Sequence, residues 1–110
     1  MENLLELDKW VGHVAGSIYG DLSLHFPYPP LMLIPMLTFK VKRALEPLPS
    51  PDRMSAKRAL EVAGRLRASI VPLLHSLELE PSDIERMAPI IETAASRALS
   101  GRGGFHHAIE

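Results

Sequence analysis

The stretch from residue 26 to residue 39, FPYPPLMLIPMLTF, constrains the fold more than any other part of the chain. It contains four prolines and no charged residue. Proline disfavours helical geometry in the residue before it, so a helix that arrives from the N-terminal side has to end near Phe26. Proline is well accepted in the first turn of a helix, so a second helix can begin near Pro30. We therefore expect an extended corner at 26–30 and a second helix over 30–45.

The expected second helix is apolar on nearly every side until Lys40. Helices of this kind lie in the middle of a domain or in an interface between subunits. Pro35 would remove one backbone hydrogen bond from the helix and crowd the carbonyl of Leu31, which bends a helix. We predict a buried helix that is kinked near Pro35, so that the apolar part of the stretch is chiefly structural.

Three further helices follow from apolar residues that recur every third or fourth position. They are expected over 3–24, over about 51–77 and up to about residue 99. The apolar stripes are Leu4, Leu7, Val11, Val14, Ile18 and Leu22 in the first, Ala56, Ala59, Ala63, Leu66, Ile70, Leu73 and Leu77 in the next, and Ile84, Met87, Ile91, Ala94 and Ala98 in the last. The chain is thus predicted to be all-α.

Two serines are expected to begin the later helices. Ser50 precedes Pro51, which suits an N-cap followed by the first helical residue. Ser82 and Glu85 have the spacing of a capping box. Pro89 falls inside the last helix and is expected to bend it.

Length and composition agree with one compact bundle of about four helices. A chain of 110 residues with 46% hydrophobic residues is large and apolar enough for one core. We expect a single domain over 1–100 and a mobile C-terminal tail over 101–110, because the tail is rich in glycine.

The chain has no cysteine, which excludes disulfides and cysteine-based metal sites. The first residues include acids, unlike the basic start of a signal peptide, and the longest charge-free segment is interrupted by prolines, unlike a membrane span. These features favour a cytoplasmic protein without a membrane span.

Motifs that carry catalysis are missing from the sequence. It contains no Glu-x-x-His pair of a helical di-metal site, no Gly-x-Ser-x-Gly elbow and no P-loop. An enzyme would need a polar pocket formed by groups such as His13, Asp21 or His75, and the sequence shows no set that converges. We expect a non-enzymatic protein with no cofactor, metal or small-molecule substrate.

Three features instead favour a protein partner or self-association, and the first is the second helix, which is apolar on nearly every side. Glycines recur at every fourth position of the first helix, which suggests close packing against that face, and the stiff corner would present an aromatic ring. The residues expected at this interface are Gly12, Gly16, Gly20, Phe26, Tyr28, Pro29 and Pro30. The leading hypothesis is a small interaction or assembly subunit, oligomeric or part of a larger complex.

The segment 40–67 is basic, with eight Lys or Arg residues and three acids, a net charge of +5. One interpretation is that its cations face acidic helices of the same molecule or a sister subunit. The alternative is a nucleic-acid-binding subunit whose phosphate contacts are Lys40, Arg43, Lys57, Arg58 and Arg65. No aromatic residue lies among these cations in the sequence to stack on bases.

Overall fold

The computed structural model describes residues 2–26, 31–48 and 54–100. Four helices occupy these ranges: α1 (Glu2–His25), α2 (Leu33–Leu45), α3 (Ala56–Ser76) and α4 (Pro81–Leu99). The prediction of an all-α bundle of four helices is confirmed. Within the described ranges, none of the helices combines the length and the apolar character needed to cross a bilayer.

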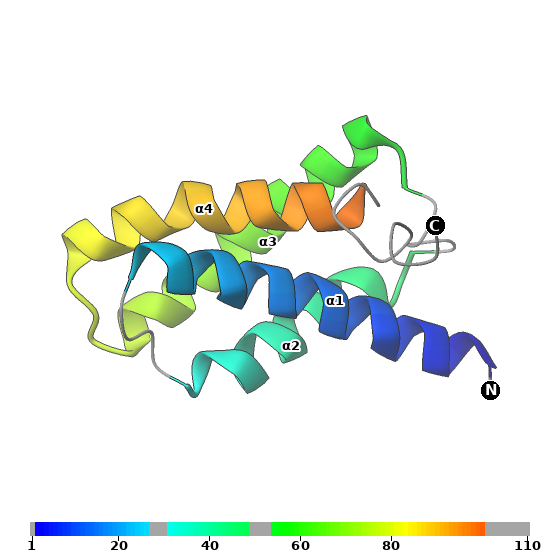
Figure 1. The fold of residues 1–110 in the computed structure, drawn as a ribbon, viewed down its shortest axis with the longest axis horizontal. Coiled ribbons are helices and arrows are strands. Elements are labelled where there is room, and N and C mark those ends of the chain that lie inside the picture. Colours follow the sequence, from blue (N-terminus) through cyan, green and yellow to red (C-terminus); the bar gives the residue numbers. More distant parts are fainter. Residues whose placement is uncertain (1, 27–30, 49–53, 101–110) are drawn as a thin grey trace.

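The four helices form a closed ring of neighbours. Each helix packs against the next one in the chain, and α1 also packs against α4. Figure 1 shows that successive helices run in alternating directions along the long axis of the molecule. This up-and-down arrangement needs only short connections, and it places the outer face of every helix in contact with solvent.

One hydrophobic core fills the middle of the ring. On α1, the side chains expected in the apolar stripe between residues 10 and 22 are all buried: Val11, Val14, Ile18 and Leu22. Trp10, the single tryptophan of the chain, is buried as well. The other helices contribute Leu33, Leu37, Val41, Leu45, Ala59, Val62, Ala63, Leu66, Ile70, Leu74, Ile84, Met87, Ile91, Ala94, Ala95, Ala98 and Leu99. The stripe expected for the last helix is therefore confirmed in full.

The second helix begins later than expected. α2 starts at Leu33, after a turn in which the Ile34 amide donates to the Leu31 carbonyl over 3.0 Å. Pro35 is therefore the third residue of the helix. The first amides of a helix have no intrahelical acceptor, so Pro35 removes no ladder hydrogen bond here. The lost hydrogen bond that was expected to bend the helix at Pro35 therefore does not occur. Pro89, by contrast, lies inside α4 as expected.

The starts of α3 and α4 also correct the sequence-based expectation. Ser55 is the N-cap of α3, and its hydroxyl accepts from the Arg58 amide over 3.1 Å. Ser50 lies outside the described residues. In α4, Pro81 takes the first helical position after Glu80, and no side chain caps the helix. The capping box predicted for Ser82 is wrong because Ser82 already lies within the first turn.

The connection between α3 and α4 contains one residue in a left-handed backbone conformation. Glu78 has a φ of 62° and follows Leu77, the C-cap of α3. This position after a helix is most often glycine, since a side chain with a Cβ is crowded there. The sharp turn at Glu78 lets α4 return antiparallel to α3 (Figure 1).

Candidate functional site

An apolar surface lies on the outer face of α2, where the sequence predicted burial. Leu31, Met32 and Phe39 are 75%, 55% and 57% exposed, and Ile34 is also exposed. The prediction that this part of the chain is wholly buried is wrong. The inner face of α2 fills the core, and the first half of its outer face is also apolar, with no other described helix over it.

The exposed apolar residues form a continuous row. Met32, Pro35 and Phe39 are three and four positions apart, so they lie above one another on one side of the helix. Leu31 and Ile34 widen this row. We call these five residues the apolar face of α2. Such a pattern is typical of a helix that packs against a partner, and large exposed apolar patches are uncommon on monomers.

A groove of 570 Å³ lies beside this face, between the second half of α2 and the first half of α3. Its lining contains three cationic side chains and no acid. Lys40 and Arg43 come from α2, and Arg65 comes from α3, with Phe39 at the rim and Ser69 on the α3 side. We call it the cationic groove. The guanidinium of Arg43 lies over the Phe39 ring, 5.9 Å from its centroid.

The arginines in this groove differ from the other arginines that the structure describes. Arg58, Arg67, Arg86 and Arg97 each form an ion pair with a carboxylate: Glu61, Glu92, Asp83 and Asp21, respectively. Neither Arg43 nor Arg65 has a carboxylate partner among the described residues. The two arginines without one thus lie in the same groove.

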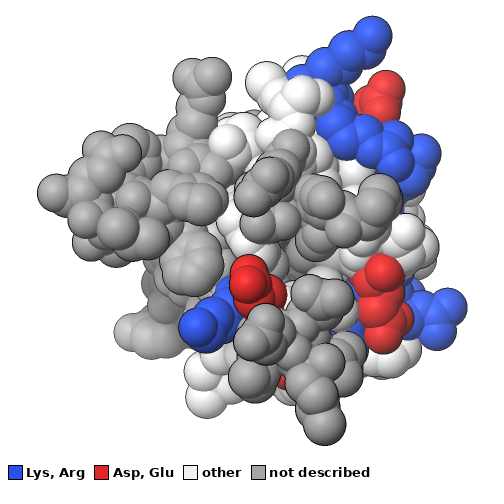
Figure 2. Space-filling view, turned by 90° about the vertical axis from the view of Figure 1, so that its right-hand side faces the viewer, with Lys and Arg blue, Asp and Glu red and all other residues white. Residues whose placement is uncertain are grey.

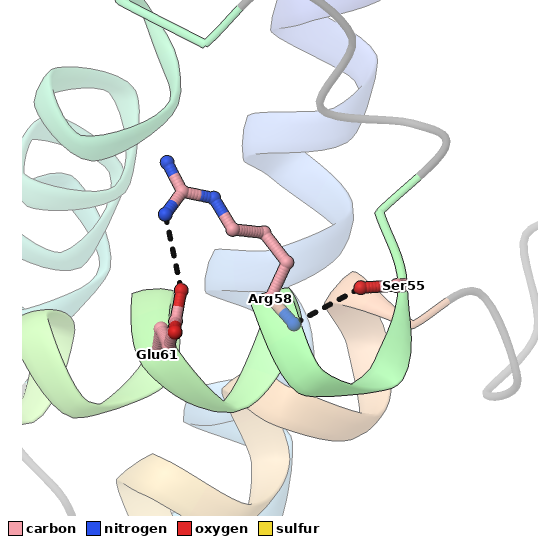
Figure 3. Close-up of polar contacts among 3 residues, drawn as sticks. All are labelled: Ser55, Arg58 and Glu61. Carbon is pink, nitrogen blue, oxygen red and sulfur yellow. Dashed lines mark hydrogen bonds and ion pairs between the residues drawn. The ribbon is translucent and has the colours of Figure 1, made fainter.

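The composition of α2 and α3 explains this lack of partners. α2 contains no acidic residue, and α3 contains only Glu61. Figure 3 shows the Glu61 carboxylate turned toward Arg58, from which it accepts a hydrogen bond of 3.1 Å. Arg65 follows Glu61 by one helical turn, but that carboxylate is already engaged on its other side.

Among the described residues, carboxylates neutralise only part of the basic segment. Of its cations, Arg58 pairs within α3 and Arg67 pairs with Glu92 of α4 over 2.8 Å. Figure 2 shows one end of the bundle, where the described Lys and Arg side chains lie close to Asp or Glu side chains. The interpretation that acidic helices absorb the charge of segment 40–67 therefore accounts for Arg67 and not for Lys40, Arg43 or Arg65.

The structure separates the other cations from this groove. Lys57 and Arg58 lie near the start of α3 and do not line it. Phe39 was not expected beside these cations, although it directly precedes Lys40 in the sequence. The missing signal was the helical spacing that places Phe39 and Arg43 on one side of α2.

The interface residues expected from the sequence have different positions. Gly12, Gly16 and Gly20 are exposed, and apart from the local backbone of α1 and the adjacent residues no described atom lies within 4 Å of a Cβ placed on any of them. The described residues therefore form no close packing seam at these glycines. Phe26 was expected on an exposed corner, but it is only 8% exposed because its ring packs in the core. The guanidinium of Arg86 lies over this ring, 4.7 Å from the ring centroid. Tyr28, Pro29 and Pro30 lie outside the described residues.

A second groove, of 690 Å³, lies between α3 and α4. His75 lines it together with Arg67 and Glu85, so it carries charges of both signs. The other polar groups considered for catalysis lie elsewhere: Asp21 is paired with Arg97, and His13 makes an edge contact with Trp10. Within the described part of the chain, no three His, Cys, Asp or Glu residues are arranged to hold a metal ion.

Comparison of the chain with protein-family models, with curated proteins and with solved structures found no match.

Proposed function

We propose that the protein is a small interaction or assembly module that binds another protein subunit through the apolar face of α2. The single observation that carries this proposal is the exposure of Leu31, Met32 and Phe39 on a helix whose opposite side fills the core. Covering such side chains removes apolar area from water, and this is the main favourable term in most protein association.

The location of the apolar face supports a docking role. α2 is fixed from below by Leu33, Leu37, Val41 and Leu45, so its outer row is presented on a rigid element. A rigid surface loses little conformational freedom when it binds, and this favours affinity. A single exposed leucine, such as Leu60 on α3, is ordinary for a soluble domain, but five neighbouring apolar residues form a patch.

The test compares three proteins: the wild type, the double variant Met32→Glu/Phe39→Glu and the control Leu60→Glu. Leu60 is 57% exposed, as Phe39 is, but lies on another helix. Analytical ultracentrifugation measures self-association, and quantitative mass spectrometry of proteins captured from host extract measures binding to other subunits. The double variant should lose the assembly or the captured proteins, and Leu60→Glu should keep them. Equal behaviour of all three proteins would refute the proposal.

The alternative function is nucleic-acid binding by the segment 40–67. It is supported by the cationic groove and by the exposed Phe39 ring, since cations contact phosphates and aromatic rings stack on bases. Only Lys40, Arg43 and Arg65 of the five expected cations lie in this groove. Binding to polynucleotide that falls steeply with salt and is lost in Arg43→Glu/Arg65→Glu would support this alternative.

A further inference from the structure

The apolar face of α2 and the cationic groove form one continuous surface. Arg43 follows Phe39 by one turn and covers its ring, and Lys40 is the next residue after Phe39. Any segment that covers Phe39 therefore also approaches the three cations of the groove. A partner that offered only apolar side chains would bury these cations without a counter-charge, which is costly.

From this juxtaposition we propose that the surface binds an acidic amphipathic helix of a partner protein. Its apolar side chains cover Met32, Pro35 and Phe39, and its carboxylates pair with Lys40, Arg43 and Arg65. This inference rests on the proposed function, because it names the chemical class of the segment that binds the apolar face.

The dimensions of the surface suit a short helix. From Leu31 to Arg43 the surface extends over twelve residue steps, which corresponds to about 18 Å at the helical rise. A partner helix of three to four turns matches this length. Binding of an amphipathic helix to an apolar surface is a common mode of recognition, and flanking charges select the partner and its orientation.

The same surface suits nucleic acid less well. A protein that holds a duplex through phosphates commonly makes about six to ten such contacts, and the groove offers three cations. Aromatic stacking would use Phe39 but would leave Leu31, Met32 and Ile34 uncovered. An acidic amphipathic segment uses both the aliphatic row and the cations.

The test uses three designed helical peptides of about 14 residues, which span roughly 21 Å. All three share one leucine-rich face, and the positions beside it are Glu, Gln or Lys. Binding is measured with the full-length protein by fluorescence anisotropy. Each exposed ion pair contributes a factor of about two to the binding constant, so the Glu peptide should bind about tenfold more tightly than the Gln peptide. The Lys peptide should bind most weakly, and added NaCl should reduce the preference for Glu.

Three variants locate the binding site. Lys40→Gln/Arg43→Gln/Arg65→Gln should abolish the preference for the Glu peptide while retaining binding of the Gln peptide. The control Lys9→Gln/Lys57→Gln/Arg86→Gln changes the net charge equally, lies outside the groove and leaves the Arg58–Glu61 pair intact, so it should keep the preference. Met32→Glu/Phe39→Glu should weaken binding of all three peptides.

The outcomes separate this inference from the proposed function. Equal binding of the Glu and Gln peptides, lost together in Met32→Glu/Phe39→Glu, would overturn the acidic partner and leave the apolar face as a docking surface. Binding of no peptide would also overturn the acidic partner, and the assembly experiment with Leu60→Glu as control would then judge the proposed function separately. A single-stranded oligonucleotide that binds more tightly than the Glu peptide and depends on the same three cations would assign the groove to nucleic acid instead.

Discussion

Leu37 and Phe39 are two residues apart on α2 and lie on opposite sides of it: Leu37 is 1% exposed and Phe39 is 57% exposed. We expect Leu37→Ala to lower the free energy of unfolding by about 2–5 kcal/mol, because it removes a core side chain and leaves a cavity. Phe39→Ala should change it by less than about 1 kcal/mol, since the ring is largely in water already. Urea unfolding followed by the fluorescence of the buried Trp10 measures both, and a larger loss for Phe39→Ala would contradict the described orientation of α2.

The glycines of α1 give a prediction of opposite sign. A methyl group on Gly12, Gly16 or Gly20 meets no described atom within 4 Å beyond the local backbone of α1 and the adjacent residues, and glycine costs about 1 kcal/mol of helix stability relative to alanine. Each Gly→Ala substitution should therefore raise the free energy of unfolding, by up to about 1 kcal/mol. Thermal unfolding tests this. Stabilisation accompanied by loss of self-association in ultracentrifugation would show that the glycines serve an interface between copies.

Ser55 caps a helix and Ser82 does not, and substitution of each serine should show this difference. Ser55 accepts from the Arg58 amide, so Ser55→Ala should cost about 1 kcal/mol and Ser55→Asp should restore most of the loss. Ser82 makes no capping bond in α4, so Ser82→Ala should change stability by no more than about 0.5 kcal/mol. Chemical denaturation of the three variants measures these differences, and a larger loss for Ser82→Ala would mean that α4 begins where the sequence predicted.

The left-handed residue between α3 and α4 is a site for stabilisation. Glu78 has a φ of 62°, where a side chain costs roughly 1 kcal/mol and glycine costs little. Glu78→Gly should raise the melting temperature by a few degrees. The control Glu78→Ala removes the same charge but keeps the Cβ, so it should give no comparable gain. An equal effect of both variants would assign the gain to charge instead of backbone geometry.

Apolar spacing alone predicted much of the fold. The four helices and the inner stripe of α4 follow from side chains that recur every three or four residues, because this period matches one face of a helix. In α3 the predicted stripe drifts by one position near its end, where Leu74 is buried and Leu73 is only partly buried. Local spacing could not locate that shift, since it depends on how α3 packs against α2 and α4.

The sequence was least informative about α2 and the candidate site. A helix that is apolar on all sides carries no signal for which side faces the core, so the exposure of Met32 and Phe39 could not be read from it. Lys40 and Arg43 lie on α2 and Arg65 lies on α3. Local spacing along one helix therefore cannot show that the three cations line the same groove, because this depends on how the two helices pack together. Helix starts were also ambiguous, since both Ser50 and Ser55 have the chemistry of an N-cap.

The closure of the ring by α1 and α4 has a consequence for synthesis. Asp21 of α1 pairs with Arg97 of α4, 76 residues later in the chain. At a translation rate of about 5–20 residues per second, Arg97 is added about 4–15 s after Asp21. α1 and α2 can pair early as a hairpin, but the side of α1 that contacts α4 stays uncovered during this interval. The nascent chain therefore exposes apolar side chains of α1 until α4 has left the ribosome, and a chaperone that binds short apolar segments would find its target there.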